Sequence, residues 1–600
     1  MAAKYEGLDR EDGKCTWKSL KNRACSRCGK IIIGVILLCI IVIGLVIGLV
    51  HRRDKSFGGP YKIGAVATDT QECSKIGKDI LNVNGSAVDA AIAAMFCLGV
   101  VSMHSSGIGG GGVMLLYNQT LKKSTVIDFR ETAPGSAYWD MFRGKKEEAE
   151  KGGLSIAVPG EVHGLFEAWQ RYGRLPWKHL VQPAIDLAKD GFKVSKALDD
   201  ALKTTENITQ DIRNDPGLSE LLLVDNKRLV KKGDVIKNEK YAKTLERVRD
   251  NPESFYNGAL ASDILRDLEK VNGIWTDSDL SGYEHMEREP YQRELSGMKM
   301  YLTPPPTSGA VLGLILNILQ GYNLTSSAFK DDKSSVLTYH RIIEAFKFSY
   351  AWRSLLGDPY FNSDIKEKAL EMLDPKTGKR LRNKIWDNKT HKDVSYYADF
   401  FSNADYGTTH VAVLAPDGDA VSVTSTINMR FGAKYRSTTT GIIYNNEMAD
   451  FDIPDENIVD GISPSPYNYP DSHKRPLSNM CPTIFTDNNG VVQLVIGASG
   501  GKLIPTAVSQ VLMNKLWFGD DLSEAVNEPR LHTQMVPDQR VFYENNKKYR
   551  IDKYVIEGLK QLGHIVTSSD LFAVVQAISR EPKGIYAKSD PRKHGEPAGQ

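Results

Sequence analysis

The chain has 600 residues, of which 41% are hydrophobic and 25% are charged, which is the composition of an ordinary globular protein. Its formal net charge is only +2, and no basic stretch is interleaved with aromatic residues, so a nucleic-acid-binding protein is excluded. No group of His, Cys and acidic residues has the spacing typical of a metal site.

The first marked change in composition is an apolar segment at 31–50, twenty residues without a charge. As a helix it would be about 30 Å long, the thickness of a bilayer core. A cleaved signal peptide would have a shorter apolar core and small residues after it, whereas a charged segment follows here at 51–55. We therefore expect an uncleaved transmembrane signal-anchor at 31–50, with a cytosolic tail at 1–30 and a linker at 51–60.

The orientation of this span is hardly decided by charge, because basic residues are nearly balanced on its two sides. The sequons for N-glycosylation are more informative, since all five follow the span: Asn84, Asn118, Asn207, Asn323 and Asn388. We expect a type II glycoprotein of the plasma membrane, with one membrane span and a large extracellular domain over 61–600.

The seven cysteines divide between the two sides of the span. Cys25 and Cys28 have no second pair of ligands, so reversible acylation beside the membrane is favoured over zinc binding. On the predicted extracellular side of the span lie Cys73, Cys97 and Cys481. A disulfide between Cys73 and Cys97 would close a loop of roughly 25 residues and contribute roughly 3–4 kcal/mol in the chain-entropy model. Cys481 would then be unpaired.

The extracellular part begins with a predicted strand at 61–68, followed by a helix at 73–83. A second helix at 86–101 is rich in alanine and apolar on nearly all sides, so we expect it to be buried. Ser86 is its predicted N-cap, which makes Asn84 a doubtful glycan site.

A glycine-rich segment at 107–112 matches the Gly-x-Gly-x-x-Gly pattern of dinucleotide-binding loops. Such a loop follows a strand and opens a helix, whereas this segment follows a helix and opens a predicted strand at 113–117. We therefore interpret it as a site of tight backbone packing and not as a nucleotide site. Another predicted strand at 124–129 ends directly before Arg130.

Residues 154–400 are predicted to be mostly helical, with short strands between the helices. Amphipathic helices are predicted at 161–171, 183–189 and 334–352, and a further helix at 310–319 follows a proline-rich loop. Together with the strands before and after this block, the order favours two antiparallel sheets between helical layers.

A hairpin is predicted around residues 408–427. Its strands, at 408–414 and 420–427, are rich in β-branched residues and flank a Pro-Asp-Gly turn. We interpret the bond from Gly407 to Thr408 as a cleavage site, because cleavage would give Thr408 a free α-amine that can serve as base for its own hydroxyl. Taken alone, a threonine in this position is far more often an ordinary strand residue than a nucleophile.

Further strands are predicted beyond the hairpin, at 441–446, 482–486 and 491–498. Gly500 and Gly501 follow the last of them and lead into a predicted helix that ends near residue 517.

With these segments in place, the chain resembles the γ-glutamyltransferases (glutathione hydrolases), members of the N-terminal-nucleophile hydrolase superfamily. The resemblance covers about residues 60–600. It rests on motifs that include Gly85-Ser-Ala-Val-Asp-Ala-Ala, Thr424-Ser-Thr-Ile-Asn, Asn445-Asn-Glu-Met, Met480-Cys-Pro-Thr and Gly595-Glu-Pro-Ala-Gly. It implies an α+β fold of four layers (an αββα sandwich), self-cleavage into chains 1–407 and 408–600, and no metal or other cofactor.

The resemblance also implies roles for residues of a catalytic centre. Thr408 matches the nucleophile and Thr426 the residue that assists it. Gly500 and Gly501 match the glycines of the oxyanion hole, where backbone N–H groups stabilise the developing charge. Without the resemblance, this Gly-Gly pair would read equally well as the start of a helix. His410 is expected to be a packing or hydrogen-bonding residue and not a base.

The implied substrate carries an α-carboxylate and an α-ammonium group, so the resemblance also implies binding residues. Arg130 matches the arginine that binds the carboxylate, for which a planar guanidinium is well suited. Glu447 and Asp450 match the residues that bind the ammonium, with Asn428 beside them. Two serines of the family hold the carboxylate as well. Ser478 matches the first, but Asn479 stands where the second serine is usual, which puts that contact in doubt.

The function implied is cleavage of γ-glutamyl amides, glutathione among them, through a γ-glutamyl-enzyme ester that is passed to water or to an amino acid or dipeptide. Two alternatives stay open. Another acylase of the same superfamily is disfavoured by Arg130 with Glu447 and Asp450, which suit an amino-acid head group. A cell-surface binding protein without catalysis is disfavoured by the retention of Thr408 and Thr426.

Overall fold

The structure, a computed structural model, describes residues 58–401, 407–456, 458, 462–535, 539–570 and 573–600. The cytosolic tail and signal-anchor predicted from the sequence lie outside these residues, as does most of the predicted linker. None of the helices described is both long enough and apolar enough to span a bilayer. The residues from Gly58 onward form one compact unit. The linker prediction is wrong for Gly58–Pro60, since these residues begin a strand that pairs with the C-terminal part of the chain.

Two antiparallel sheets of seven strands each form the centre of this unit. Sheet 1 has the order β1 (Gly58–Tyr61), β22 (Gly584–Ser589), β21 (Val574–Glu581), β17 (Val492–Ser499), β16 (Thr483–Thr486), β11 (Met298–Leu302) and β10 (Tyr291–Leu295). Sheet 2 has the order β23 (Ala598–Gly599), β2 (Ala65–Thr68), β13 (Thr409–Leu414), β14 (Ala420–Thr426), β3 (Gly111–Asn118), β4 (Lys123–Phe129) and β9 (Met286–Arg288).

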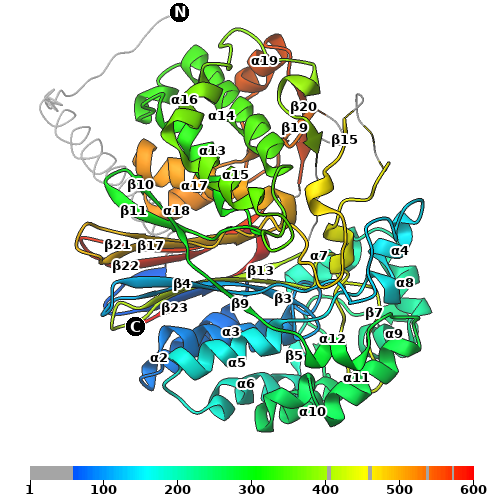
Figure 1. Ribbon diagram of the computed structural model, residues 1–600. Helices are drawn as coiled ribbons and strands as arrows, with labels where there is room; N and C mark the ends of the chain where they lie inside the picture. Colours follow the sequence, from blue (N-terminus) through cyan, green and yellow to red (C-terminus); the bar gives the residue numbers. More distant parts are fainter. Residues whose placement is uncertain (1–57, 402–406, 457, 459–461, 536–538, 571–572) are drawn as a thin grey trace, which may run out of the picture. The chain divides into compact units, whose positions relative to one another are not determined.

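Helices cover the outer face of each sheet, so the unit has four layers (Figure 1). Sheet 1 is covered by α13 (Gly309–Gln320), α14 (Asp332–Arg353), α15 (Asp364–Leu373), α16 (Pro375–Arg382), α17 (Ile504–Met513) and α18 (Leu522–Asn527). Sheet 2 is covered by α2 (Gln71–Asn82), α3 (Ala87–Val101), α5 (Glu161–Tyr172), α6 (Trp177–Asp190) and α10 (Glu239–Asp250). The predicted αββα arrangement is therefore present.

The alternation of side chains along β13 shows how the layers are held together. Val411 and Val413 belong to the apolar core between sheet 2 and its helices. Ala412 and Leu414 belong to the core between the two sheets. Since successive residues of a strand point to opposite faces, the apolar residues 411–414 of this one strand serve two cores.

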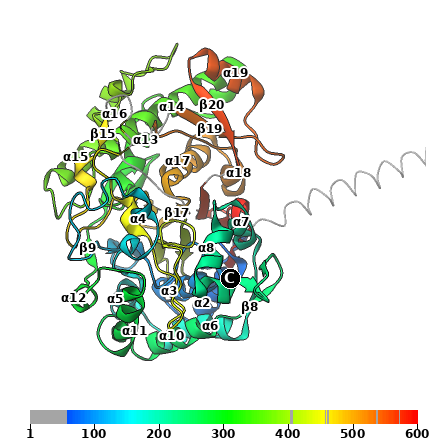
Figure 2. The same ribbon diagram turned by 90° about the vertical axis from the view of Figure 1, so that its right-hand side faces the viewer.

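The remaining elements surround these layers. The shorter helices are α4 (Lys146–Glu150), α7 (Lys196–Thr204), α8 (Ile208–Asn214), α9 (Pro216–Leu222), α11 (Ala259–Glu269), α12 (Asp277–Ser281) and α19 (Lys553–Gln561). Small sheets are formed by β5 (Phe192–Lys193) with β8 (Val235–Ile236), β6 (Leu223–Val224) with β7 (Arg228–Leu229), β12 (Phe400–Phe401) with β15 (Ser463–Pro464), and β18 (Leu531–His532), β19 (Arg540–Glu544) and β20 (Ile565–Ser569). Both views place α4, α7 and α8 at one end of the two large sheets (Figures 1 and 2).

The helix α3 is buried along its whole length, as its composition predicts. It begins with a capping box, in which the Ser86 hydroxyl accepts from the Asp89 amide and the Asp89 carboxylate accepts from the Ser86 amide. The expected disulfide between Cys73 and Cys97 joins α2 to α3, with 5.5 Å between the Cα atoms. Cys481 is free and buried.

The glycine-rich segment before β3 packs against the backbone of β14. A Cβ atom on Gly110 would lie 1.9 Å from the carbonyl oxygen of Thr426, and one on Gly112 would lie 2.2 Å from that of Thr424. No larger residue fits at these positions, so the prediction of tight backbone packing is confirmed.

Two sequence predictions need correction. The predicted strand at 441–446 is absent, and only an isolated bridge joins Arg436 to Ile443. The physical reason is that the side chain of Asn445 bonds the backbone carbonyls of Gly109 and Ala157, which holds this segment against β3 without a ladder. The helix after the Gly-Gly pair is also not continuous, because a 3-10 turn precedes α17 and a π-helical turn, Asn514–Phe518, follows it.

Candidate active site

Two neighbouring strands bring Thr408 and Thr426 to the same carbonyl group. Thr408 directly precedes β13 and Thr426 ends β14, and the adjacent residues Thr409 and Ser425 are register partners. The Thr408 hydroxyl donates a hydrogen bond of 2.5 Å to the carbonyl oxygen of Gly407, and the Thr426 hydroxyl donates one of 2.6 Å to the same oxygen. The bond predicted to be cleaved therefore has its carbonyl between two hydroxyl groups.

Only glycine fits at position 407. Its φ is +137°, a backbone conformation that other residues rarely adopt. A Cβ atom there would also lie 2.3 Å from the carbonyl oxygen of Asn428. The backbone conformation and this close contact explain why a glycine precedes Thr408.

All of the predicted substrate-binding residues line one small cavity. Its volume is about 10 Å³, room for about one water molecule. Besides Gly407, Thr408 and Gly501, its lining includes Arg130, Thr426, Asn428, Glu447, Asp450, Ser478 and Asn479. Sequence reasoning missed Met480 and Ile504, which supply apolar surface here. The tertiary structure thus brings together residues from six separate stretches of chain.

Arg130 is the buried cation of this cavity. It directly follows β4, and its guanidinium pairs with the carboxylates of Glu447 and Asp450. Burial alone would lower the pKa of Arg130, but the charges of the two carboxylates raise it above its usual value. Burial raises the pKa of Glu447 and of Asp450, although Arg130 opposes the shift. Both acids reach Arg130 because they are the first and last residues of one short 3-10 turn, Glu447–Asp450.

The cavity holds an excess of hydrogen-bond acceptors. Four buried oxygen atoms in its lining have no hydrogen-bond partner among the described residues: Asn428 Oδ1, Glu447 Oε2, Asp450 Oδ1 and Asn479 Oδ1. Leaving buried acceptors unpaired costs free energy, so this arrangement favours a ligand that brings N–H donors. A primary ammonium group has three such donors.

Glu131 is a buried acid beside this cavity that sequence reasoning missed. Its carboxylate lies 3.7 Å from Arg130, and neither of its oxygen atoms has a hydrogen-bond partner among the described residues. Burial raises the pKa of Glu131 well above its usual value, and the charge of Glu447 raises it further. The shift favours the protonated form of Glu131. Its position directly after Arg130 was the only signal in the sequence.

The loop of Ser478 and Asn479 is anchored by its backbone. The Ser478 amide donates to the carbonyl oxygen of Pro306, and its own carbonyl accepts from the Ser308 hydroxyl at 2.6 Å. The Ser478 hydroxyl accepts from the Met480 amide at 3.2 Å. This anchoring presents Asn479 to the cavity at the position where the sequence departs from the family pattern.

Gly500 and Gly501 follow β17 beside Thr408. Their φ angles are +125° and +55°, and a Cβ atom on Gly500 would lie 2.7 Å from Cα of Ala573. Gly501 lines the small cavity, whereas Gly500 lines a larger cleft, and Thr408 lines both. The pair of glycines thus lies next to both cavities that Thr408 lines.

The larger cleft has a volume of about 920 Å³ and opens on the other side of Thr408. Lys593 projects into it and donates a hydrogen bond of 2.8 Å to the carbonyl oxygen of Thr408, while pairing with Asp69 at 2.6 Å. Sequence reasoning missed both residues. Lys593 lies two positions before the closing Gly-Glu-Pro-Ala-Gly motif, and this was the only signal.

His410 is a structural residue, as predicted. Its ring nitrogens lie 2.8 Å from the hydroxyl of Thr424 and 3.3 Å from that of Ser422. Burial lowers the pKa of His410 to about 3, so the imidazole is neutral. It packs between the sheets against Gly497, where a Cβ atom would lie 2.2 Å from the ring.

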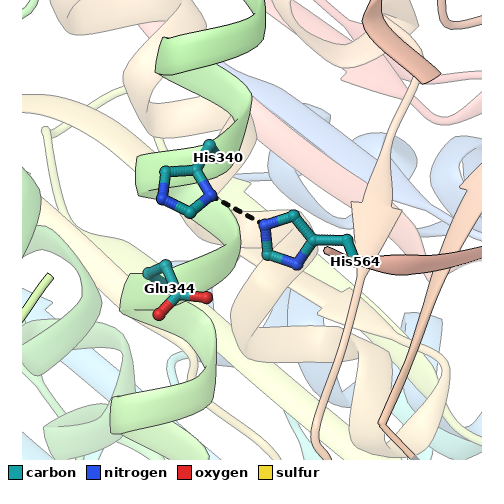
Figure 3. A group of neighbouring side chains, drawn as sticks. All are labelled: His340, Glu344 and His564. Carbon is teal, nitrogen blue, oxygen red and sulfur yellow. Dashed lines mark hydrogen bonds between the residues drawn. The ribbon is translucent and has the colours of Figure 1, made fainter. Parts of the chain in front are cut away.

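Away from this site, one group of side chains resembles a metal site: His340, Glu344 and His564 (Figure 3). The imidazoles of His340 and His564 are hydrogen-bonded to each other at 2.7 Å. The Glu344 carboxylate accepts from Tyr397 and pairs with the ammonium of Lys347 at 3.1 Å. A metal ion would have to lie beside that ammonium, so the group is better described as a buried hydrogen-bonded network.

Comparison with known proteins shows the family. The family model for gamma-glutamyltranspeptidase matches residues 73–600. Glutathione hydrolase 2 of Arabidopsis thaliana is 40% identical over 89% of this chain and 93% of its own length. Scoloptoxin SSD14 of Scolopendra dehaani is 38% identical over 92% of this chain and 97% of its own length.

The fold is also similar to that of a solved structure, cephalosporin acylase from Bacillus halodurans. The TM-score is 0.74 at 27% identity, over 90% of this chain and 96% of the acylase. The family match covers the strands that carry Thr408 and Thr426 and every residue of the small cavity. The chain therefore belongs to the gamma-glutamyltranspeptidase family and is an enzyme of the glutathione hydrolase type.

Proposed function

We propose that this enzyme cleaves the γ-glutamyl amide bond of glutathione and its conjugates with Thr408 as nucleophile. The observation that carries the proposal is the small cavity beside Thr408, with one buried guanidinium and four unpartnered acceptor oxygens. A γ-glutamyl group offers both complements, since its α-carboxylate suits Arg130 and its α-ammonium suits Glu447 and Asp450. The cavity, about 10 Å³ in the uncut chain, must widen to admit this group.

The precursor would first cleave itself. The Thr408 hydroxyl oxygen attacks the carbonyl carbon of Gly407, the C–N bond breaks, and the amine of Thr408 takes up a proton. The hydrogen bond from Thr426 would stabilise negative charge on that carbonyl oxygen during the attack. Water then hydrolyses the resulting ester, which leaves chain 408–600 with a free hydroxyl and a free α-amine on its first residue.

The same two groups would then act on substrate. The α-amine, with a reference pKa of about 7.7–8.0, takes the proton of the hydroxyl as its oxygen attacks the γ-carbonyl carbon. Amide groups of Gly500 and Gly501 would stabilise the oxyanion. The amide C–N bond breaks, the leaving amine receives the proton, and a γ-glutamyl ester of Thr408 remains. Attack by water or by the amine of an amino acid or dipeptide releases the group and restores the enzyme.

Hydrolysis of a different acyl group is the alternative, since the similarity to cephalosporin acylase extends over most of both chains. Arg130 distinguishes the two proposals. A buried cation enclosed by Glu447 and Asp450 suits an amino-acid head group and would be costly beside an apolar acyl chain.

The membrane anchor is a separate proposal. The uncharged segment at 31–50 supports a single span, and the sequons beyond it support an extracellular catalytic unit joined to that span. Extraction of membranes with alkaline carbonate tests this, because full-length protein should stay in the pellet and a chain starting at residue 58 should not. Release of the full-length chain would contradict the anchor.

The function is tested with wild-type enzyme and the variants Thr408→Ala and Thr408→Ser. We expect the wild type to yield a fragment whose first residue is Thr408 and to release aniline from a γ-glutamyl anilide. Thr408→Ala should stay uncut and inactive, whereas Thr408→Ser should retain part of both activities. Thr409→Ala is the matched control, because the Thr409 hydroxyl bonds Ser106 and not Gly407. A cut, active Thr408→Ala enzyme would contradict the proposal.

A further inference from the structure

Two of the cationic side chains that line the larger cleft beside Thr408 have no counterion among the described residues. Five basic side chains line this cleft. Three have a carboxylate partner: Lys151 with Asp211, Arg592 with Glu544, and Lys593 with Asp69. For Arg430 and Lys434, by contrast, no described carboxylate lies within the 4.0 Å of an ion pair, and both side chains are only half-buried.

Most of the hydrogen-bonding capacity of Arg430 is unused. Its guanidinium donates to the Thr204 hydroxyl on α7, which occupies one of five N–H groups. Lys434 donates to the carbonyl oxygens of Arg430 and Gly432. Burial lowers the pKa of Arg430, and it lowers that of Lys434 to about 8. A desolvated cation without a partner costs free energy, and a bound anion would offset that cost.

The positions of Asn428 and Arg430 along the chain indicate which part of the substrate would lie beside these cations. Asn428 lines the small cavity, has a φ of +68°, and is followed two residues later by Arg430 on the larger cleft. If the γ-glutamyl group occupies the small cavity, the group on the other side of the scissile bond must lie in the larger cleft. That group is the leaving amine in the first half of the reaction and the acceptor amine in the second.

The acids whose charges act on the two cations are paired with other residues. Asp211 acts on Lys434 but pairs with Lys151, and Glu150 acts on Lys434 but pairs with Lys146. Asp200 on α7 lines the cleft and its charge acts on Arg430, but its carboxylate pairs with Lys196 on the same helix. Among the described residues, only Thr204 takes up a donor of the Arg430 guanidinium, which lines the cleft. Its other donors can bind a carboxylate through two parallel hydrogen bonds.

We propose that Arg430, with Lys434 beside it, binds a carboxylate carried by the leaving group or by the acceptor, and so selects donors and acceptors that are anionic on that side. The inference rests on the proposed function, since it assigns the γ-glutamyl group to the small cavity. It adds a specificity-determining site in the larger cleft that acts on both half-reactions.

The donor half is tested with two γ-glutamyl anilides that differ by one carboxylate on the aniline ring. In Arg430→Gln we expect kcat/KM for the carboxylated anilide to fall roughly tenfold, the size expected for loss of a charge-assisted pair of hydrogen bonds. For the uncharged anilide we expect a change below about twofold, since only the carboxylate is recognised. Lys151→Gln is the matched control, because it removes a paired charge from the same cleft.

The acceptor half is tested by transfer from the uncharged anilide to glycylglycine and to glycylglycinamide. Arg430→Gln should raise the KM for glycylglycine roughly tenfold and leave that for the amide unchanged. A carboxylate effect in only one half identifies whether the leaving group or the acceptor is the ligand. An unchanged preference in both halves, or an equal effect in Lys151→Gln, would overturn the inference alone. A wild-type enzyme that cleaves neither anilide would overturn the proposed function and this inference with it.

Discussion

The hydroxyl of Thr426 donates a hydrogen bond of 2.6 Å to the carbonyl oxygen of Gly407. Because that oxygen would gain negative charge during self-cleavage, removing the donor should slow the reaction by about 10²-fold. We predict that Thr426→Val stays largely uncut over a time in which the wild type is fully processed, as followed by electrophoresis. Thr426→Ser keeps the hydroxyl and should be processed at close to the normal rate. Equal processing rates for Thr426→Val and the wild type would show that the hydrogen bond from Thr426 does not assist cleavage.

Asn479 offers a test of how the substrate carboxylate is held. Asn479 lines the cavity, and its side-chain NH₂ group could donate to a carboxylate. Asn479→Ser keeps a donor at the cavity, so the KM for a γ-glutamyl anilide should change by less than about threefold. Asn479→Asp adds a negative charge near the bound carboxylate and should raise the KM at least tenfold, since like charges in a buried site repel strongly. If the two variants bind substrate equally well, the carboxylate lies elsewhere.

Glu161 at the start of α5 should make stability depend on pH. Burial raises the pKa of Glu161 to about 8, and only the Ser425 hydroxyl opposes the shift. In the unfolded chain the pKa is about 4.5, so between pH 4.5 and 8 the unfolded chain has lost a proton that the folded chain keeps. The free energy of unfolding therefore falls as pH rises through this window.

Glu161→Gln removes that dependence. Relative to wild type, its free energy of unfolding should rise from pH 5 to pH 8 by an amount on the order of a few kcal/mol. Urea unfolding at both pH values measures the difference. Glu167→Gln on the same helix is the control, because it removes a partly exposed carboxylate. A constant difference between Glu161→Gln and wild type would contradict the buried, protonated state.

The disulfide between Cys73 and Cys97 should contribute measurably to stability. Their sequence separation is 24 residues, for which the chain-entropy model gives about 3–4 kcal/mol. We expect the double variant Cys73→Ala, Cys97→Ala to unfold at a lower urea concentration than the wild type. A reducing agent should lower the urea midpoint of the wild type and leave that of the double variant unchanged. An unchanged midpoint in the double variant would show that the bond adds no stability.

Removal of metal ions should leave the enzyme unchanged. The lysine beside Glu344 already balances the charge of its carboxylate, and burial lowers the pKa of His564 to about 2, so the charges of the network are balanced without an ion. Dialysis against a chelator should alter neither anilide cleavage nor the thermal midpoint. A loss restored by Zn²⁺, and absent in His564→Gln, would instead establish a metal site there.

Local sequence signals predicted the elements that carry the site. The hairpin of β13 and β14, the capped helix α3 and the glycine packing before β3 all follow from short-range patterns, because β-branched runs, caps and glycines act on their own neighbourhood. The strand at 441–446 was predicted wrongly for the converse reason. Its backbone is held by Asn445 through contacts with residues distant in the chain, and no local pattern records these.

The sequence by itself determined the family, the hairpin with Gly407 and Thr408, and the residue types needed for an amino-acid head group. Only the tertiary structure decided that Arg130, Glu447 and Asp450 line one small cavity, that Glu131 lies beside them, and that Arg430 lines the larger cleft with no ion-pair partner among the described residues. The physical reason is that burial and charge pairing depend on segments hundreds of residues apart, so the ionisation and partners of these groups exist only once the two sheets have packed.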